Sequence, residues 1–446
     1  MMRHFLLPFF ILCFSCSSNH DLLITNVSVI NIETGKVTVS DIVIKDSIIV
    51  KIAEPGTIAN NAETHIDGSN NYMIPALWDM HVHIQDSSYL RLFLDHGVTG
   101  VRDMGGCVHK PTDGCESLCA EYLNQWKSDM RLGKMRGPRL FIAGYLLSGT
   151  GWPTSLSVSN KEEVAVAFQQ NLEDQVDFIK VYEKIPWESY KEIARLSKLH
   201  GLDFVGHVSE PFLLSDILDL GQKSIEHIRE PLLYSFTKDS LELEQFMMAD
   251  GYSEEDRKIV QPWLHDSERV VEAFKRNQAW ITPTMAVQYA RLRYNDEPWI
   301  SHPIRDQLPE SVNQGMHAHM ESMSASMDKK GDSLWWMALT KLVKRFSMEE
   351  IGLLAGSDTA CEGGLPGYSL HEELFLMVEE AGLSPLEALQ TATVNPCRFF
   401  NLKKHGKIAE GYYADLVLLT NNPLSNIRNT LAIKAVIQNG NVERFN

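Results

Sequence analysis

The sequence lacks any dense run of basic residues, and this absence narrows the classes of protein that it could encode. Its 41 Lys and Arg residues stand against 58 Asp and Glu residues, which gives a formal net charge of −17. A nucleic-acid-binding surface needs clustered Lys and Arg. We therefore expect neither a nucleic acid nor another polyanion as a partner.

An apolar run long enough to span a membrane is missing at the N-terminus. The run at residues 5–14 follows Arg3 and is shorter than the roughly 20 residues of a transmembrane helix. Such a run is typical of a cleaved secretory signal. The residues after it resemble a bacterial lipobox with Cys16 as the acylated residue, although Cys13 stands where Leu is usual. We predict a lipoprotein-type signal peptide over residues 1–15, with an ordinary cleaved signal as the alternative.

This signal predicts an exported bacterial protein that touches a membrane only through its lipid anchor. It would lie on the periplasmic face or at the outer membrane, and the sequence leaves open which of the two membranes holds it.

Cysteine is scarce, with seven residues in the whole chain. Cys107, Cys115 and Cys119 lie close together in a polar stretch, and no second Cys/His pair with the spacing of a structural zinc site lies near them. An exported chain can keep disulfides. We therefore expect a local disulfide among these three cysteines, whose pairing cannot be read from the sequence.

Both ends of the chain alternate apolar and polar residues in the manner of antiparallel strands. The pattern runs through residues 22–54 and returns at residues 414–419 and 435–442. With 446 residues and 44% hydrophobic content, the chain can bury one large domain and a smaller companion. We predict a small β-sandwich domain that is assembled from residues 21–70 and 407–446.

The middle of the chain alternates short apolar runs with longer amphipathic stretches, such as residues 187–200 and 370–381. This alternation is typical of a (β/α)8 barrel. Ser384, followed by Pro and three residues later by Glu387, has the signature of a helix start. We predict an α/β fold in which residues 71–406 form a TIM barrel. The eight apolar runs are residues 73–83, 99–103, 139–144, 178–182, 203–207, 224–227, 280–284 and 352–358.

Histidines and one aspartate fall at the ends of these runs. Residues i and i+2 of a strand project to the same side, so His81 and His83 can reach one metal ion. His207, His227 and Asp358 close three later runs. In a barrel, active sites are built at the C-terminal ends of the strands. Neutral imidazoles and a carboxylate are ordinary zinc ligands, so we predict a metal centre there.

Lys180 lies inside the otherwise apolar run at residues 178–182. A lone Lys in a buried strand is costly to keep charged. The neutral amine can take up CO2 and become a carbamate, whose oxygens can bridge two cations. The alternative is a strand register shifted by one residue, which would turn Lys180 outward to solvent.

Three other histidines are weaker candidates for metal ligands. His317 and His319 lie in a stretch with helical character, where residues i and i+2 do not face each other. We expect them on the surface. His371 begins a helix after Asp358 and could either reach the pocket or have a structural role at the helix end.

The sequence resembles the amidohydrolase superfamily, within its imidazolonepropionase-like and Xaa-Pro-dipeptidase-like group. By this resemblance, His81 and His83 would hold the more buried metal ion, and His207 and His227 would hold the second. The resemblance covers nearly the whole mature chain. The motifs that carry it, in the expected order, are residues 74–83, 97–103, 178–182, 206–208, 224–227, 354–358 and 411–417.

The same resemblance implies the roles of the two catalytic residues. Lys180 would be the carbamate that bridges the two metal ions. Asp358 would ligate the first ion and act as the base. Imidazolonepropionase lacks the bridging Lys, so Lys180 favours the two-metal branch of the group. The implied cofactors are two divalent ions, expected to be Zn²⁺, and CO2 bound as the carbamate.

The implied function is hydrolysis of a C–N (amide) bond in a small substrate by a hydroxide that bridges the two ions. The expected substrates are a dipeptide of the Xaa-Pro type, an N-acyl amino acid or a cyclic amide. The alternatives are a deaminase of an amino-heterocycle and a non-catalytic, lipid-anchored binding protein. The sequence leaves the substrate and the oligomeric state open, including a homo-oligomer.

Tyr182 and Arg102 are the candidates for substrate binding. Tyr182 points to the same side of its strand as Lys180, and Arg102 could hold a substrate carboxylate as a two-pronged donor. For each of them the alternative is a packing residue at the rim of the barrel.

Overall fold

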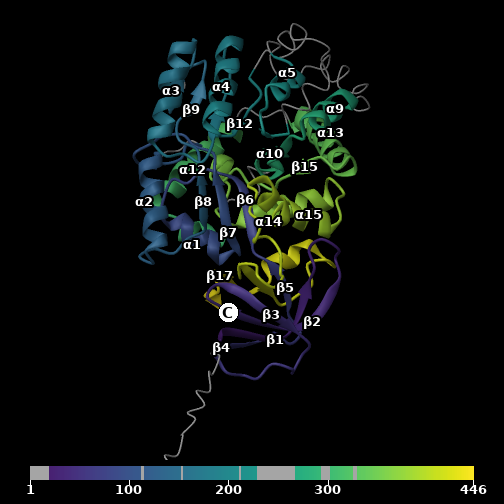
Figure 1. Cartoon of the computed structure of the whole chain (residues 1–446). Coiled ribbons are helices and arrows are strands. Elements are labelled where there is room, and N and C mark those ends of the chain that lie inside the picture. Colours follow the sequence, from purple (N-terminus) through teal and green to yellow (C-terminus); the bar gives the residue numbers. More distant parts are fainter. Residues whose placement is uncertain are drawn as a thin grey trace, which may run out of the picture.

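The computed structural model describes residues 20–111, 115–151, 154–209, 212–228, 267–292, 302–324 and 329–445. Within these residues, a smaller sheet built from both ends of the chain lies below a larger α/β body (Figure 1). Cys16, the predicted site of lipidation, lies outside the described residues.

The lower sheet joins strands that are far apart in the sequence. Its strand order is β18-β17-β16-β5-β1-β2-β3, with β4 paired to β1. Strand β16 from the C-terminal end pairs antiparallel with β5, and an apolar cluster that includes Leu22, Ile42 and Leu416 gives this sheet a core of its own. The strands are β1 (His20–Ile30), β2 (Val37–Lys45), β3 (Ile48–Ala53), β4 (Ala62–Asp67), β5 (Tyr72–Pro75), β16 (Leu416–Leu419), β17 (Ile433–Gln438) and β18 (Asn441–Phe445).

The larger body contains two parallel sheets that are joined by hydrogen bonds at two places. Met80 N donates to Ala355 O (2.9 Å), just beyond β15, and Asp177 N, just before β11, donates to Ile142 O (2.8 Å). The result is a TIM-barrel-like arrangement. One sheet holds β6 (Leu77–Val82), β7 (Val98–Asp103) and β8 (Arg139–Ile142). The other has the order β10 (Ser155–Ser157), β9 (Leu146–Ser148), β11 (Ile179–Val181), β12 (Phe204–Gly206), β13 (Ser224–Glu226), β14 (Trp280–Thr282) and β15 (Gly352–Leu353).

Each of the eight predicted runs contains a strand of the structure. The first run is divided, since β5 lies in the lower sheet and β6 in the barrel-like body. The chain therefore passes from one part to the other between Pro75 and Leu77. Short strands β9 and β10 were not predicted.

Helices cover the outside of the parallel strands (Figure 1). The predicted helix start at Ser384 is confirmed, because Ser384 and Glu387 form a reciprocal capping box. The α-helices are α1 (Ser88–Asp95), α2 (Ala120–Arg131), α3 (Lys161–Glu173), α4 (Trp187–His200), α5 (Leu214–Asp219), α9 (Glu268–Asn277), α10 (Met285–Leu292), α12 (Glu310–Ser324), α13 (Lys329–Met348), α14 (Tyr368–Glu379), α15 (Pro385–Thr391) and α16 (Val394–Phe399). Short 3-10 helices are η1 (Pro303–Gln307), η2 (Cys361–Gly363) and η3 (Ile427–Leu431).

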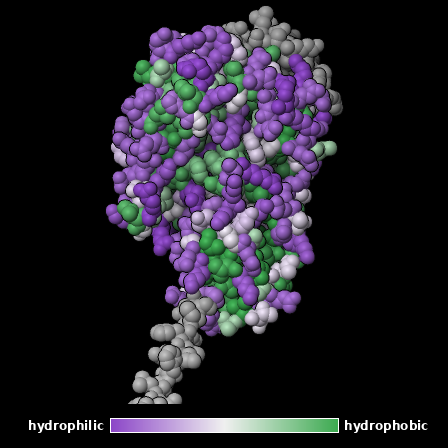
Figure 2. Space-filling model, viewed as in Figure 1, coloured by the Kyte–Doolittle hydropathy of each residue, from purple (hydrophilic) through white to green (hydrophobic). Residues whose placement is uncertain are grey.

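The visible surface is largely polar over the helical body, and apolar side chains gather on the lower sheet (Figure 2). Exposed apolar residues in the strands of this sheet include Val39, Val50 and Phe445. Of the helices that the structure describes, none has both the length and the apolar character needed to cross a bilayer.

Candidate metal centre

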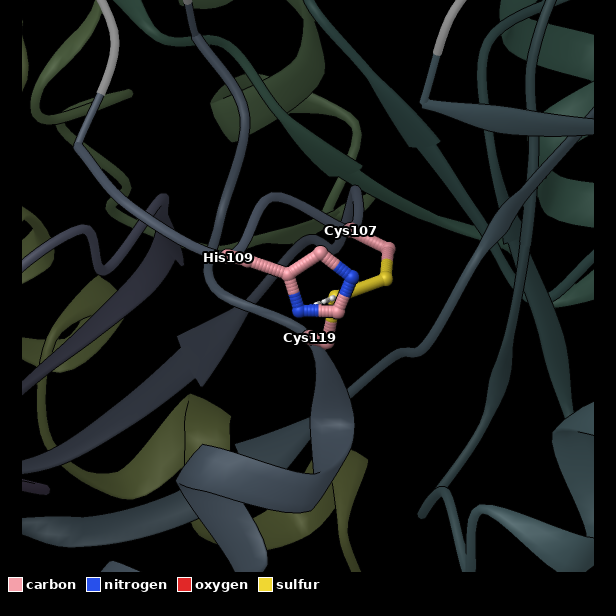
Figure 3. A group of neighbouring side chains, drawn as sticks. All are labelled: Cys107, His109 and Cys119. Carbon is pink, nitrogen blue, oxygen red and sulfur yellow. Dashed lines mark hydrogen bonds between the residues drawn. A yellow bond between two sulfur atoms is a disulfide. The ribbon is translucent and has the colours of Figure 1, made fainter.

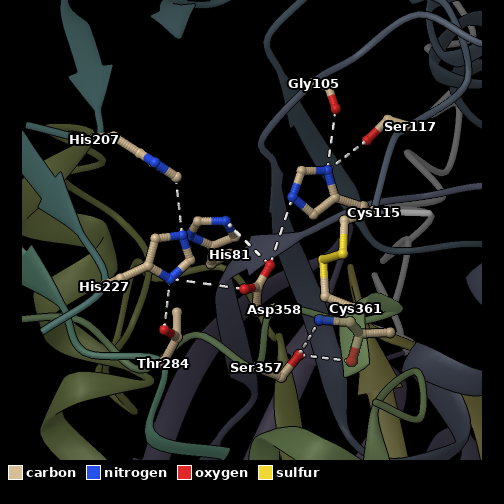
Figure 4. Close-up of a disulfide and its surroundings, with 12 residues drawn as sticks. His81, Gly105, Cys115, Ser117, His207, His227, Thr284, Ser357, Asp358 and Cys361 are labelled. Atoms are coloured by element: carbon tan, nitrogen blue, oxygen red, sulfur yellow. Dashed lines mark hydrogen bonds and ion pairs between the residues drawn. A yellow bond between two sulfur atoms is a disulfide. The ribbon is translucent and has the colours of Figure 1, made fainter. Parts of the chain in front are cut away.

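Four histidines and one aspartate meet at the C-terminal ends of the parallel strands (Figure 4). His81 Nε2 lies 3.3 Å from Asp358 Oδ1, and His83 Nε2 lies 3.5 Å from the same oxygen. His227 Nδ1 is 3.7 Å from the other carboxylate oxygen, and His227 Nε2 is 3.0 Å from His207 Nε2. The four histidines and the aspartate that were predicted as metal ligands therefore form one cluster.

The strands bring these residues together directly. His81 lies in β6 and His83 follows it, while His207 and His227 come immediately after β12 and β13. Asp358 lies in the loop after β15, and its backbone N–H donates to His81 O (2.8 Å). This hydrogen bond holds the loop against β6, so the carboxylate lies among the imidazoles.

The backbone at the site is in an uncommon conformation. His227 has a φ of 68°, Asp358 a φ of 56° and Thr284 a φ of 50°. Residues other than glycine rarely adopt this left-handed backbone conformation, which costs of order 1–3 kcal/mol for each residue. Residues in this conformation cluster at active sites. The surrounding barrel must therefore hold these three residues in place.

The outer nitrogen of each of three imidazoles has a hydrogen-bond partner. His83 Nδ1 donates to Gly105 O (3.0 Å), and His81 Nδ1 lies 3.0 Å from Glu226 Oε2. His227 Nδ1 lies 2.8 Å from Thr284 Oγ1. A carbonyl or an ionised carboxylate only accepts hydrogen bonds. His81 and His83 therefore carry the proton on Nδ1, and their Nε2 lone pairs face Asp358, which is the orientation of a metal-binding imidazole.

Lys180 lies near the same cluster, because its charge acts on the imidazoles of His81, His83 and His207. Its side chain is 2% exposed, and its neighbours Ile179 and Val181 belong to the apolar core of the body. Burial, and after it the charge of Lys180, lowers the pKa of His83 to about 3. The same two causes hold the pKa of His81 and that of His207 well below the ordinary value. These imidazoles are thus neutral at neutral pH, which is the form that binds metal.

The chemistry of this donor set fits divalent metal ions. The donor atoms of His81, His227 and Asp358 all lie within 4.8 Å of one another. Neutral imidazole nitrogen with carboxylate oxygen is the usual ligand set of Zn²⁺. His207 and His227 face each other through Nε2 atoms, so a cation near both would replace a contact between two ring nitrogens.

Arg102 has a different position from the one predicted. Its side chain is fully buried. Its Nε donates to Met80 O (2.6 Å), its Nη1 donates to Ser224 Oγ (3.0 Å), and its Nη2 donates to Glu226 Oε2 (2.7 Å) and Thr282 Oγ1 (2.9 Å). The prediction that Arg102 binds a substrate carboxylate is therefore wrong, because every nitrogen of its guanidinium is bonded inside the barrel.

Tyr182 lies at the edge of the cluster. Its half-buried ring is 4.4 Å from the ring of His207, measured between centroids. It therefore remains a candidate for contact with a substrate. His371 is buried elsewhere, between Thr430 Oγ1 and His96 O at 2.9 Å each, and so has a structural role.

Two disulfides secure the loop after β7. Cys107 pairs with Cys119, which confirms the predicted local bridge (Figure 3), and Cys115 pairs with Cys361, 246 residues away (Figure 4). His109 Nδ1 lies 3.8 Å from Cys119 Sγ. Because the two sulfurs of the local pair are bonded to each other, they do not offer thiolate ligands to a metal there.

This loop supports the first pair of metal-binding candidates. It supplies Gly105 O to His83, and Ser117 Oγ donates to Asp103 Oδ2 (2.8 Å) while lying 3.3 Å from His83 Nδ1. The partner cysteine, Cys361, donates its backbone N–H to Asp358 O (2.7 Å). The long-range disulfide thus ties the surroundings of His83 to the loop of Asp358.

Sequence reasoning missed Glu226, Thr284 and Gly105, which hold the outer nitrogens of the imidazoles. A signal for Glu226 was present, since it is a charged residue in the short, fully buried strand β13 and directly precedes His227. The sequence gives no such signal for Thr284 and Gly105, because their contacts with the imidazoles form only in the folded protein.

Comparison with known proteins agrees with this fold. Residues 310–442 match the family model described as amidohydrolase family. Among solved structures, a Xaa-Pro dipeptidase with bound methionine has a TM-score of 0.66 and 19% identity, covering 94% of this chain and 99% of that one. Bottromycin amidohydrolase has a TM-score of 0.70 and 22% identity, covering 94% and 86%.

Curated relatives match only over short segments. Adenine deaminase of Methanothrix thermoacetophila is 33% identical over 85 residues, and ochratoxinase of Aspergillus niger is 36% identical over 88 residues. These segments cover 18% and 19% of this chain but only 14% and 17% of the relatives. The chain therefore spans less than a fifth of the length of these relatives.

The fold and the strand-end cluster define a TIM-barrel-like protein with a candidate metal centre. The fold is similar to that of a Xaa-Pro dipeptidase and of bottromycin amidohydrolase, and residues 310–442 match the amidohydrolase family model.

Proposed function

We propose that this protein is a metal-dependent hydrolase that cleaves a C–N (amide) bond of a small substrate. The observation that carries the proposal is the meeting of four imidazoles and the Asp358 carboxylate, beside the buried Lys180, at the strand ends of one barrel. The barrel is proposed to be a closed (β/α)8 barrel of β6, β7, β8 and β11 to β15, and the hydrogen bonds from Met80 to Ala355 and from Asp177 to Ile142 support this closure.

We assign the metal-binding roles by position. His81 and His83 would hold one divalent cation together with Asp358, and His207 and His227 would hold a second. Two Zn²⁺ ions bound here would polarise a substrate carbonyl and would lower the pKa of a water held between them from 15.7 to about 7. The outer hydrogen bonds of His81 and His83 keep the lone pairs of these rings directed inward.

Lys180 is proposed to be a carbamate that joins the two cation sites. Its amine would add to CO2, forming an N–C bond and releasing one proton. Counted from the ammonium form, which first loses a proton to give the amine, two protons leave and the side chain carries a negative charge in place of a positive one. A buried ammonium among neutral imidazoles would repel cations, whereas a carbamate offers them oxygen ligands, and this difference supports the assignment.

Asp358 is proposed to move the proton. Its Oδ1 lies 3.3 Å from His81 and 3.5 Å from His83, and Oδ2 lies 3.7 Å from His227, so the carboxylate is central to the cluster. It would accept the proton of the attacking water and deliver it to the departing nitrogen, which otherwise leaves as a poor anion.

The substrate class we propose is a dipeptide of the Xaa-Pro type or an N-acyl amino acid. The fold shared with a Xaa-Pro dipeptidase and with Aspergillus niger ochratoxinase supports this class. Tyr182, beside His207 at the edge of the cluster, is the described residue that we expect to contact the substrate.

A screen of dipeptides and N-acyl amino acids on Zn²⁺-reconstituted protein tests the proposal. We expect release of a free amino acid from at least one member of the library. Asp358→Asn should lower kcat by about 10²- to 10⁴-fold, the usual contribution of a general acid–base group. A metal-loaded protein that hydrolyses no member, or an Asp358→Asn variant with full activity, would contradict it.

Deamination is the second candidate, because adenine deaminases are among the curated relatives. Ammonia released from an amino-heterocycle, without turnover of any dipeptide, would select it. The same preparation can be used for both assays, so the two candidates are separated in one experiment.

We also propose that the protein is exported and acylated at Cys16. The two disulfides support export, because disulfides persist in oxidising compartments. Cys16→Ser should move the protein from the membrane fraction to the soluble fraction of the cell. An unchanged distribution would contradict the anchor and leave the proposed chemistry untouched.

A further inference from the structure

A buried ion pair lies directly behind the candidate metal centre. Arg102 in β7 and Glu226 in β13 are both fully buried, and Arg102 Nη2 donates to Glu226 Oε2 at 2.7 Å. Neither side chain can meet a substrate from this position. The pair nevertheless touches the site, because the same Glu226 oxygen lies 3.0 Å from His81 Nδ1.

Each side-chain nitrogen of Arg102 and each carboxylate oxygen of Glu226 has a hydrogen-bond partner. Glu226 Oε1 accepts a hydrogen bond from Ser224 Oγ (2.6 Å), and the guanidinium of Arg102 is held by Met80 O and Thr282 Oγ1 as well as by Glu226. A satisfied network of this kind fixes its members in one arrangement. Residues of β6, β13 and β14 therefore fix the position of the Glu226 carboxylate. Through this carboxylate they also fix the ring of His81.

Glu226 differs from the partners of the other imidazoles. His83 Nδ1 is held by a backbone carbonyl and His227 Nδ1 by a hydroxyl, whereas His81 Nδ1 faces a carboxylate. A carboxylate behind a metal-binding imidazole fixes its tautomer and makes its other nitrogen a stronger donor to metal. Arg102 is needed because a buried carboxylate without a counter-charge is costly.

We propose that Arg102 and Glu226 are positioning residues of the metal centre, which orient and polarise His81 and so raise the affinity of its cation site. This inference rests on the proposed function. The sequence predicted that Arg102 contacts the substrate; the inference instead gives Arg102 a role in metal binding.

The test compares Zn²⁺ affinity, measured by competition with a chromogenic chelator, between wild type and Glu226→Gln. Glutamine keeps the size of the side chain and removes its charge. We expect affinity at one of two sites to fall about 10- to 100-fold, the usual effect of losing such a partner. In the Co²⁺-substituted protein the visible absorption bands should shift. Thr284→Val, which removes the uncharged partner of His227, is the matched control and should have a smaller effect.

A double variant separates positioning from folding. Glu226→Gln alone leaves the charge of Arg102 buried, and loss of one partner of a buried pair destabilises a fold. Arg102→Met with Glu226→Gln removes both charges. The inference predicts that this variant regains thermal stability while its Zn²⁺ affinity stays low. Recovery of both quantities would show a purely structural role and would overturn the inference.

The outcomes also separate this inference from the proposed function. A wild-type protein that binds no Zn²⁺ would contradict both the proposed function and this inference. A wild-type protein that binds two ions and hydrolyses an amide, together with a Glu226→Gln variant of unchanged affinity and unchanged Co²⁺ spectrum, would overturn this inference alone.

Discussion

At the scale of single residues, Lys180 is the side chain whose chemical state matters most. It is 2% exposed and lies close enough to His81, His83 and His207 to lower the pKa of each, after the larger effect of burial. A positive charge there would oppose the proposed binding of metal ions, and the proposed carbamate would assist it. The balance between these two states should therefore govern how many cations the protein holds.

Lys180→Ala should reduce the metal content from two ions per chain to at most one, because the bridging oxygens are lost. Elemental analysis after gel filtration measures this content. In the wild type, ¹³CO2 should give a carbamate carbon signal by NMR, and the variant should lack it. Lys180→Ala protein that retains two ions per chain would refute the bridge.

The residues at strand ends could be predicted because a strand places its last side chains at a known face of a barrel. The direction of Arg102 could not be predicted. Its hydrogen bonds reach Ser224, Glu226 and Thr282, which lie on β13 and β14, far away in the sequence. Whether a buried arginine faces the pocket or the barrel interior depends on those distant partners.

At the scale of elements, the loop after β7 is joined to the loop of Asp358 by Cys115–Cys361. Replacing both cysteines by Ser should lower the free energy of unfolding by about 2–5 kcal/mol, because the bridge closes a long loop of the unfolded chain. Thermal unfolding under oxidising conditions measures the change. Cys107→Ser with Cys119→Ser is the control, and its shorter loop should give the smaller loss. Equal melting temperatures in wild type and the Cys115/Cys361 variant would contradict the prediction.

Helix α10 begins beside a buried carboxylate on α14. Glu373 Oε2 accepts the backbone N–H of Ala286 (2.7 Å), and burial is the main cause that raises the pKa of Glu373 from 4.5 to about 8. The folded state therefore binds a proton more tightly than the unfolded state. It follows that this group makes the protein less stable as pH rises from about 4.5 to about 8.

Glu373→Gln should remove this dependence, since the amide stays neutral and its oxygen can still accept the hydrogen bond. Melting temperatures of the two proteins should be similar near pH 5, and the variant should become progressively more stable than the wild type toward pH 8. A difference that stays constant across this range would show that Glu373 does not titrate as described.

Most elements could be predicted because apolar runs and helical spacing are local properties. The division of residues 73–83 into β5 and β6 could not, because Ile74, Ala76 and Leu77 are all apolar and all buried, and no polar turn residue accompanies Pro75 at the change of sheet. The short strands β9 and β10 have the sequences Leu-Leu-Ser and Ser-Leu-Ser, which do not form an apolar run.

At the scale of the whole molecule, bound metal should stabilise the fold, because the imidazoles converge only when β6, β12 and β13 are in place. Chelation should abolish hydrolysis and lower the melting temperature, and Zn²⁺ should restore both, since a ligand that binds only the folded state stabilises it. Differential scanning calorimetry with and without chelator measures the shift. An unchanged melting temperature after verified loss of metal would contradict this coupling.

The lower sheet brings together segments from opposite ends of the chain. Ile52 N in β3 donates to Glu410 Oε1, 358 residues away, and β5 pairs with β16. On the ribosome, the first strands emerge long before the segments they will pair with. This sheet can be completed only after β16 has been synthesised, so a chain interrupted before this strand would leave the edge of β5 open to other molecules.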